Sequence, residues 1–518
     1  MKKNLIILFS IAFVCNVTAQ KPEYLVSNDV NGESARFLHA TADNEHYFVI
    51  RMEKESKKVN VGYFDIYNKE SMKREISQPL NLPAKEPTQM TIRELKALGD
   101  YIFVFYDYIS QMDEMNHSAV LLLDKTGKTD GNSIELNVAK DRMKRFVNQR
   151  GEEYIESGIH RDGAGNYIMV SLLSISAIGK QMIFTVPEVN IRIFNGTGKM
   201  ISEKKLPIEI CASQLISQET DENGNLYLLF NGLTGKEGSD YHTYGYEAAT
   251  KKYYHKTVAV FNSESWNLKL YHPANDGEKL KFKILESRLY KSADGRVLLA
   301  GLYVNDDECC DPRGIYAGWF DKDGTFKGDH IDPWTVSSEN KAKKNIRLVF
   351  YSLKAVHLCK DNSIKYLLSK NYIEEYSEMR SGVFLEATVS PSLVLSMKYG
   401  MHGTNIDKDF TDYAFPTELC TDEDSYFFYN DQEKNLSKEM SDSYSKLSNS
   451  EMRESVKPCY SHFPKNGSVE NKVFISDVKG ESNVLIQSSN ALKINDSELL
   501  VPVMIGGRNH LMKITMSQ

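Results

Sequence analysis

Short apolar runs recur along the whole chain, and each one follows a turn rich in Asp, Asn and Gly. The eight turns contain Asp43, Asp100, Asp162, Asp221, Asp294, Asp361, Asp422 and Asp496, and the runs that follow them are HYFVIRM, YIFVFYD, YIMVSLL, LYLLFNG, VLLAGLY, IKYLLSK, SYFFYND and SELLVPV. Asp and Asn side chains hydrogen-bond to the backbone of a tight turn, and Gly tolerates positive φ there. The pattern therefore predicts a β-hairpin at the start of each of eight units.

A second strand and a second turn follow in seven of the eight units. Their sequences are YFDIYNKES, LLLDKTGKT, RIFNGTGKM, AVFNSESWN, GWFDKDGTF, FLEATVSPS and SHFPKNGSV, whereas the eighth unit ends at LMKITMSQ. A unit of four strands is too small to bury both of its own faces, so successive units must stack on one another. We expect the segment from Tyr24 to Val30 to supply the outer strand that the eighth unit lacks, which closes a ring and leaves no long open edge.

This arrangement predicts an all-β fold, a β-propeller of about eight four-stranded blades closed by an N-terminal strand. Seven blades is the nearest alternative, and a pair of smaller β domains is a more distant one. Length alone would suggest about three domains, but the repeats favour one domain over residues 20–518.

One unit carries a more specific signature. The sequence DENGNLYL at 221–228, followed by VAVFN at 258–262, resembles an NHL repeat. Over essentially the whole mature chain, the protein resembles secreted bacterial β-propellers of this NHL-like type. The kelch double glycine, the WD dipeptide, the YWTD run and the sialidase Asp box are absent from the sequence. The propeller resemblance implies a ligand surface on the face where the loops between second and third strands meet.

The N-terminus has the pattern of a secretion signal. Lys2 and Lys3 precede an apolar stretch at 5–14, and Val17 and Ala19 are small residues just before Gln20. We therefore expect residues 1–19 to be a cleaved signal peptide, and the mature protein to be periplasmic or extracellular. No later segment has the roughly 18 uninterrupted apolar residues of a membrane-spanning helix.

The charge and the cysteine content of the chain limit which partners and which stabilising bonds can be expected. The formal net charge is −7, and Lys and Arg are scattered along the chain, which argues against a nucleic-acid-binding surface. Six cysteines lie beyond Cys15 without any CxxC pair. A chain of this size does not depend on disulfides for its core, and the sequence does not determine any pairing.

Three loops between predicted second and third strands are long, at about 174–188, 232–256 and 432–456. The middle loop carries Tyr241, Tyr244 and Tyr246. Their rigid amphipathic rings suit recognition of a sugar or a peptide. The alternative is that these rings pack the loop onto its own blade. The third loop is rich in Ser and in charged residues, which is typical of a solvated insertion.

Counting back from each turn gives candidate residues at the upper end of the inner strands. They are Arg36, Arg93, Glu94, Glu156, Gln214, Arg288 and Lys354. Cations of this kind around a channel mouth would hold an anionic ligand such as an acidic sugar. The alternative is that they form ion pairs between neighbouring blades. His39 and His357 occupy equivalent places nearer the turns, where they either face the channel or are buried.

One acidic segment is a candidate Ca²⁺ loop. It runs from Asn305 through Asp306, Asp307 and Glu308 to Asp311, and such oxygen ligands in a flexible turn suit this ion. It lacks the spacing and glycine of an EF-hand, so an acidic surface loop is the alternative. We expect no other cofactor.

The sequence contains none of the common catalytic signatures: no HExxH, no GxSxG, no Walker loop and no GxGxxG after a strand. We therefore favour a secreted, non-catalytic propeller that binds a glycan, a peptide or an envelope protein. The first alternative is a hydrolase or lyase acting on polysaccharide, with Glu94 and Glu156 as acid and base at the channel mouth. The second is a structural scaffold of the cell envelope.

Overall fold

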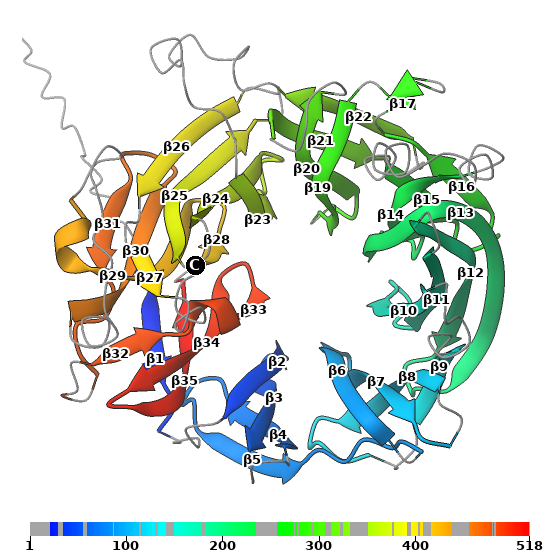
Figure 1. Ribbon diagram of the computed structural model, residues 1–518, viewed down its shortest axis with the longest axis horizontal. Coiled ribbons are helices and arrows are strands. Elements are labelled where there is room, and N and C mark those ends of the chain that lie inside the picture. Colours follow the sequence, from blue (N-terminus) through cyan, green and yellow to red (C-terminus); the bar gives the residue numbers. More distant parts are fainter. Residues whose placement is uncertain are drawn as a thin grey trace, which may run out of the picture.

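The chain forms a ring of eight antiparallel blades around a central channel (Figure 1). The computed structural model describes residues 21–516, with interruptions at 29–34, 55–59, 141–149, 235–255, 306–311, 332–350, 408–415 and 438–454 and gaps of at most four residues elsewhere. The prediction of an all-β, eight-bladed propeller is confirmed, and the alternative of seven blades is wrong. Residues 1–19, the expected signal peptide, lie outside the described residues.

The first four blades occupy the N-terminal half of the ring. Blade 1 consists of β2 (Arg36–Ala42), β3 (His46–Lys54), β4 (Asn60–Asn68) and β5 (Arg74–Pro79). Blade 2 consists of β6 (Pro87–Leu98), β7 (Tyr101–Ser110), β8 (Met115–Asp124) and β9 (Ser133–Lys140). Blade 3 consists of β10 (Arg150–Arg161), β11 (Tyr167–Ile178), β12 (Met182–Phe194) and the first half of β13 (Met200–Thr220). Blade 4 consists of the second half of β13 with β14 (Leu226–Thr234), β15 (Lys256–Phe261) and β16 (Leu268–Tyr271).

The remaining blades follow the same order after a small hairpin of β17 (Asn275–Asp276) and β18 (Lys279–Leu280). Blade 5 consists of β19 (Phe282–Lys291), β20 (Val297–Asn305), β21 (Gly314–Phe320) and β22 (Phe326–Ile331). Blade 6 consists of β23 (Tyr351–Leu358), β24 (Ile364–Glu374), β25 (Glu378–Val389) and β26 (Leu395–Met401), and β27 (Asn405–Asp407) also pairs with β25. Blade 7 consists of β28 (Thr417–Cys420), β29 (Asp424–Gln432), β30 (Val456–Pro464) and β31 (Glu470–Val473), with the 3-10 turn η5 (Glu433–Asn435) after β29.

Blade 8 joins the two ends of the chain. Its inner edge is split into β32 (Val484–Ile486) and β33 (Leu492–Asn495), which are separated by the 3-10 turn η6 (Ser488–Asn490) and followed by β34 (Glu498–Ile505) and β35 (Arg508–Thr515). The outer strand is β1 (Glu23–Val26), which pairs antiparallel with β35. Figure 1 shows β1 in blue beside β35 in red. The predicted closure of the ring by an N-terminal strand is therefore confirmed.

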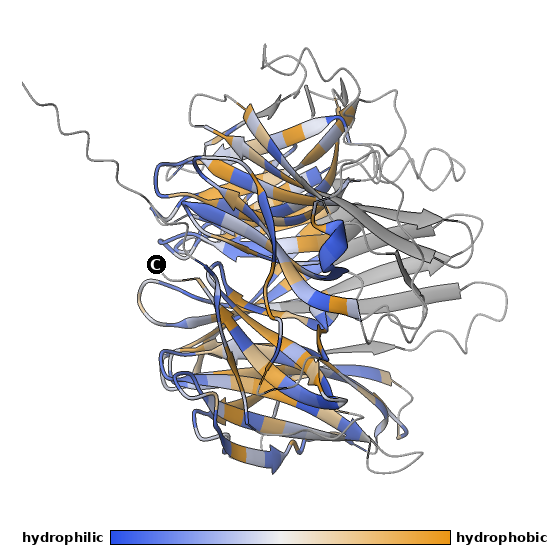
Figure 2. Ribbon diagram, turned by 90° about the vertical axis from the view of Figure 1, so that its left-hand side faces the viewer, coloured by the Kyte–Doolittle hydropathy of each residue, from blue (hydrophilic) through white to orange (hydrophobic). Residues whose placement is uncertain are grey.

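The hydrophobic core lies between the blades. Eight clusters among the described residues each join one blade to the next, including blade 8 to blade 1. Strand β14 shows how: Leu226, Leu228 and Phe230 pack toward blade 3, whereas Tyr227 and Leu229 pack toward blade 5. Because successive side chains of a strand point to opposite faces, each buried strand serves two interfaces. In Figure 2 hydrophobic segments (orange) lie within the strands, and many of the turns between them are hydrophilic (blue).

The hairpin turns form as the Asp and Asn pattern predicts. In the turn before β14, the Asp221 carboxylate accepts hydrogen bonds from the backbone N–H groups of Asn223 and Asn225, each at 2.9 Å. Gly224 in this turn has φ +78°, a value that favours glycine. Local side-chain chemistry thus fixes where each first strand ends and the next begins.

A β-bulge recurs in the inner strands. Register shifts occur between residues 37 and 39, 92 and 94, 215 and 217, 284 and 287, and 353 and 355. A bulge leaves one residue without a cross-strand partner and re-aims its side chain. Arg93 and Lys354, two of the predicted channel residues, occupy such positions.

Among the described residues, no helix has both the length and the apolar character needed to cross a bilayer.

Removal of β1 is expected to destabilise the ring. A chain that begins at Asn28 loses four cross-strand pairs and the packing of Leu25 and Val26. We expect a lower thermal midpoint and a loss of about 3 kcal/mol in unfolding free energy relative to a chain that begins at Lys21. Differential scanning calorimetry of both chains measures this difference. Equal midpoints would show that β1 does not hold blade 8 closed.

Candidate functional site

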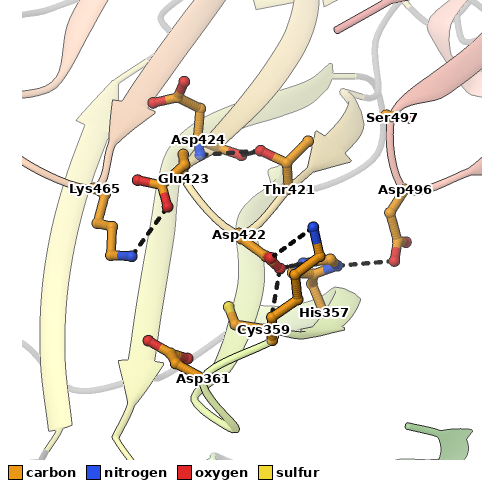
Figure 3. A pocket seen from close by; sticks show the side chains of 11 residues that line it. His357, Cys359, Asp361, Thr421, Asp422, Glu423, Asp424, Lys465, Asp496 and Ser497 are labelled. Atoms are coloured by element: carbon orange, nitrogen blue, oxygen red, sulfur yellow. Dashed lines mark hydrogen bonds and ion pairs between the residues drawn. The ribbon is translucent and has the colours of Figure 1, made fainter. Parts of the chain in front are cut away.

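A cavity of about 570 Å³ lies where the turns of blades 6, 7 and 8 meet, and we call it the turn pocket (Figure 3). Blade 6 contributes the segment after β23, blade 7 the turns before β29 and after β30, and blade 8 the turn before β34. Its lining residues are His357, Cys359, Lys360, Asp361, Thr421, Asp422, Glu423, Asp424, Lys465, Asp496 and Ser497. These turns lie at the strand ends opposite the second-to-third-strand loops, where the sequence analysis expected the ligand.

Local hydrogen bonds position the blade 6 wall of the pocket. The Cys359 N–H donates to the Ser363 carbonyl, and Asn362 takes a positive φ of 63° to close the turn. The Asp361 carboxylate accepts hydrogen bonds from the Ser363 side chain and backbone, which lower the pKa of Asp361. The turn is thereby held with Asp361 at the pocket wall.

His357 connects three blades. Its Nε2 lies 2.9 Å from Asp422 Oδ1 of blade 7, and its Nδ1 lies 2.8 Å from Asp496 Oδ2 of blade 8. Burial pushes the pKa of Asp496 upward, but the hydrogen bond from His357 and the charge of Lys493 outweigh it and lower this pKa to about 2. Asp496 is therefore a carboxylate that fixes the orientation of the imidazole ring.

Cys359 lies beside this arrangement but does not form a nucleophile pair with it. The residue is buried, and burial raises the pKa of its thiol. Both ring nitrogens of His357 face carboxylates, so the ring is not positioned as a base for the thiol. Ligand atoms of His357, Cys359 and Asp422 nevertheless lie within 4.8 Å of one another. Among the described residues, these three form a group whose ligand atoms are close enough together to hold a metal ion.

Carboxylates outnumber cations in the pocket lining. Five of the lining residues carry carboxylates and two, Lys360 and Lys465, are lysines. Asp424 is held from outside the lining by His462 at 3.0 Å, and Asp496 by Lys493 at 2.9 Å. Lys465 pairs with Glu423 at 3.1 Å, and Lys360 lies 3.8 Å from Asp422. The lining contains no Phe, Tyr or Trp among the described residues. The pocket therefore favours cationic groups and offers no aromatic platform for a sugar ring.

A second, smaller cavity of about 380 Å³ lies in the channel wall, and we call it the channel-wall cavity. Arg93 and Glu94 line it together with Phe105 and residues 215–218. The structure thus brings two of the predicted site residues together. Arg93 is held within its own blade, since its Nε lies 3.0 Å from Asp107 Oδ2 and its guanidinium donates to Ser118 Oγ at 2.6 Å.

The other predicted site residues are placed as follows. Arg36 and Arg288 are exposed on inner strands and line neither of these two cavities. Glu156 belongs to β10, but its side chain lies outside the description, as do Tyr241, Tyr244 and Tyr246 and the acidic residues 306–311 of the candidate Ca²⁺ loop. His39 contacts the next blade, with its Nε2 3.1 Å from the Ile92 carbonyl oxygen.

Sequence reasoning noted His357 but did not single out Cys359, Asp422 and Asp496 as a site. Asp422 and Asp496 were explained as turn residues, and His357 and Cys359 match no common metal spacing. The sequence did contain one indication of this site, namely that these polar residues occupy equivalent turns of successive repeats. Equivalent turns of successive blades lie at the same end of the ring, so their polar residues are expected to converge.

A buried histidine on blade 3 interacts with Gln218, one of the residues that line the channel-wall cavity. His160 of β10 is only 7% exposed, and its Nδ1 lies 3.8 Å from Glu219 Oε1. Burial, together with the nearby charge of Lys96, lowers the pKa of His160 to about 3. The folded protein therefore holds this ring neutral.

Comparison with known proteins shows no family for this chain. No family model matches the chain, and no curated protein matches it. Solved structures similar to this chain include the β-propeller domain of the Trilobed protease from Pyrococcus furiosus, at 10% identity over 72% of this chain and 97% of that one, with a TM-score of 0.33. A polysaccharide lyase aligns at 10% identity over 96% and 100% of the two chains, with a TM-score of 0.39. The α-L-arabinanase of Penicillium chrysogenum aligns at 8% identity over 68% and 93%, with a TM-score of 0.32. Likenesses at these identities concern the fold alone.

His160 is expected to make the fold sensitive to acid. The unfolded chain takes up a proton on this residue below about pH 6.5, whereas the folded chain does so only near pH 3, so stability falls as pH drops between these values. The expected slope is about 1.4 kcal/mol per pH unit in the middle of this range. His160→Gln should flatten the profile of unfolding free energy by this amount. Urea unfolding from pH 7 to pH 4 measures it, and parallel profiles for the two proteins would contradict the account.

Proposed function

We propose that this chain is an exported, non-catalytic propeller that binds a peptide segment bearing Lys or Arg side chains in the turn pocket. The observation that carries the proposal is that five acidic residues from three blades line one cavity of about 570 Å³, against two lysines in the same lining. A volume of this size suits a short segment of ligand. Guanidinium and ammonium groups are the natural partners of carboxylates in such a site.

The same lining argues against the other ligand classes considered from the sequence. An acidic glycan would place its charges against Asp361 and Asp422. A neutral glycan usually stacks on aromatic rings, which are missing from the described lining. A basic segment of a peptide or of an envelope protein fits both the excess of carboxylates and the lack of aromatic rings in the described lining.

A binding role is also supported by the state of the nucleophile in the pocket. The Cys359 thiol is buried with a raised pKa, which disfavours the reactive thiolate. His357 is engaged by Asp422 and Asp496 on its two sides. This arrangement lacks the base-to-nucleophile hydrogen bond that covalent catalysis requires.

Binding is expected to depend on the exposed carboxylates of the pocket. The double variant Asp361→Asn, Glu423→Gln removes two exposed charges from the lining. We expect it to weaken the binding of a fluorescently labelled Lys- and Arg-rich peptide by about tenfold, and the loss to shrink at high salt. Fluorescence anisotropy of the mature chain measures this affinity.

The matched control is the double variant Glu70→Gln, Glu264→Gln, which removes the same charge from exposed turns of blades 1 and 4. It should bind the peptide as the wild type does. Equal weakening by both double variants would mean that net charge, not the turn pocket, attracts the peptide. Cleavage of a polysaccharide by the wild type that is lost in Glu94→Gln would instead place function in the channel-wall cavity and overturn the proposal.

A further inference from the structure

We propose that His357, Cys359 and Asp422 bind a Zn²⁺ ion at the edge of the turn pocket. The imidazole, the thiol and the carboxylate each offer one ligand atom, and these atoms lie within 4.8 Å of one another. Figure 3 shows the three side chains side by side at the boundary between blades 6 and 7, with Asp422 on blade 7 and the other two on blade 6. Small side-chain adjustments bring such a set to the distances of about 2.0 to 2.3 Å that Zn²⁺ requires.

The backbone explains why these residues meet. His357 is the next-to-last residue of β23 and Cys359 follows the strand directly, so the two are separated by one residue. Positions two apart on an extended chain lie on the same face. Asp422 stands in the equivalent turn of blade 7, where the Lys360 N–H donates to its Oδ1 at 3.3 Å. The repeat therefore brings the third ligand across the boundary between blades 6 and 7.

Asp496 supplies the outer partner that a zinc-binding histidine needs. Its Oδ2 lies 2.8 Å from His357 Nδ1, and Lys493 Nζ lies 2.9 Å from its Oδ1. A histidine that ligates a metal commonly donates its other ring N–H to a carboxylate, which fixes the tautomer and turns the second nitrogen toward the ion. Here that second nitrogen is Nε2, which points to Asp422. This contact is independent of the ligand cluster and comes from a third blade.

The ligand types select the metal. A thiolate with an imidazole and a carboxylate suits Zn²⁺, whereas Ca²⁺ and Mg²⁺ require sets of oxygen ligands. On binding, Cys359 releases its thiol proton to solvent and forms the sulfur–metal bond. Three protein ligands leave one position of a tetrahedral ion open. Because Cys359 and Asp422 line the turn pocket, this position is available to water or to a ligand in that pocket.

The metal site goes beyond the proposed peptide binding and does not depend on it. With a divalent ion and a thiolate in place, the carboxylates of the lining still outnumber its cations. Metal affinity is measured with the ion alone, without peptide. Loss of one activity therefore leaves the other measurable, and the two proposals fail separately.

The experiment is a Co²⁺ titration of the reduced mature chain, followed by displacement with Zn²⁺. Cobalt replaces zinc in such sites and reports a thiolate ligand by a charge-transfer absorption band in the near ultraviolet. We expect this band to saturate at one equivalent of Co²⁺ and to disappear when one equivalent of Zn²⁺ is added. A chain without the band at saturating Co²⁺ would overturn the proposal.

Variants locate the site. Cys359→Ser should abolish the band, whereas Cys459→Ser, which alters another buried thiol in β30, should retain it. Asp496→Asn should weaken Zn²⁺ binding by about 10- to 100-fold while the band remains. Circular dichroism checks each fold, and Asp422→Asn replaces Cys359→Ser if the latter does not fold. If the folded Cys359→Ser variant, or Asp422→Asn in its place, bound Zn²⁺ as tightly as the wild type, the proposed set of ligands would be refuted.

Discussion

Each blade buries both faces of its sheet against its two neighbours, and this mutual burial is the constraint from which the rest of the structure follows. None of the described clusters belongs to one blade alone, so a blade gains its full core only when both neighbouring blades stack on it. Burial of apolar surface at about 25 cal/mol per Å² drives the stacking, and β1 completes it by covering the edge of β35. The two ends of the chain are thereby held in one sheet.

The ring also determines where chemistry is possible. Because every blade stacks in the same orientation, the first hairpin turns of all blades lie at one end of the ring. Residues in short turns of three neighbouring blades therefore meet there without any long loop. His357 shows the result: it belongs to blade 6 yet contacts carboxylates of blades 7 and 8. The turn pocket, its excess of carboxylates and the proposed metal ligands are consequences of this convergence. Blade 8, which holds both ends of the chain, thus also contributes to the lining of the turn pocket.

Much of this architecture was predictable from sequence, because turn chemistry and strand alternation are local. Asp221 and Gly224 mark their turn with the same interactions that the structure contains. The site was less predictable, because it depends on contacts between residues far apart in the chain, such as His357 with Asp496. Bulges in the inner strands added a further difficulty, since a one-residue shift at Arg93 changes the direction of the side chains that follow. Counting from the turn placed Arg93 and Glu94 on an inner strand, and the structure shows that both line one cavity. It did not predict that Asp107 holds Arg93.

We propose that ligands bind at the end of the ring where the first hairpin turns of blades 6 to 8 meet. Hydrogen-exchange mass spectrometry of the mature chain, with and without a saturating Lys- and Arg-rich peptide, tests it most directly. When the basic peptide is bound, we expect slower exchange of the protein's backbone amides in segments 357–363, 421–424 and 496–497. We expect no change around Arg93 and Glu94 in the channel wall. Protection around Arg93 and Glu94 without protection of the turns would contradict it.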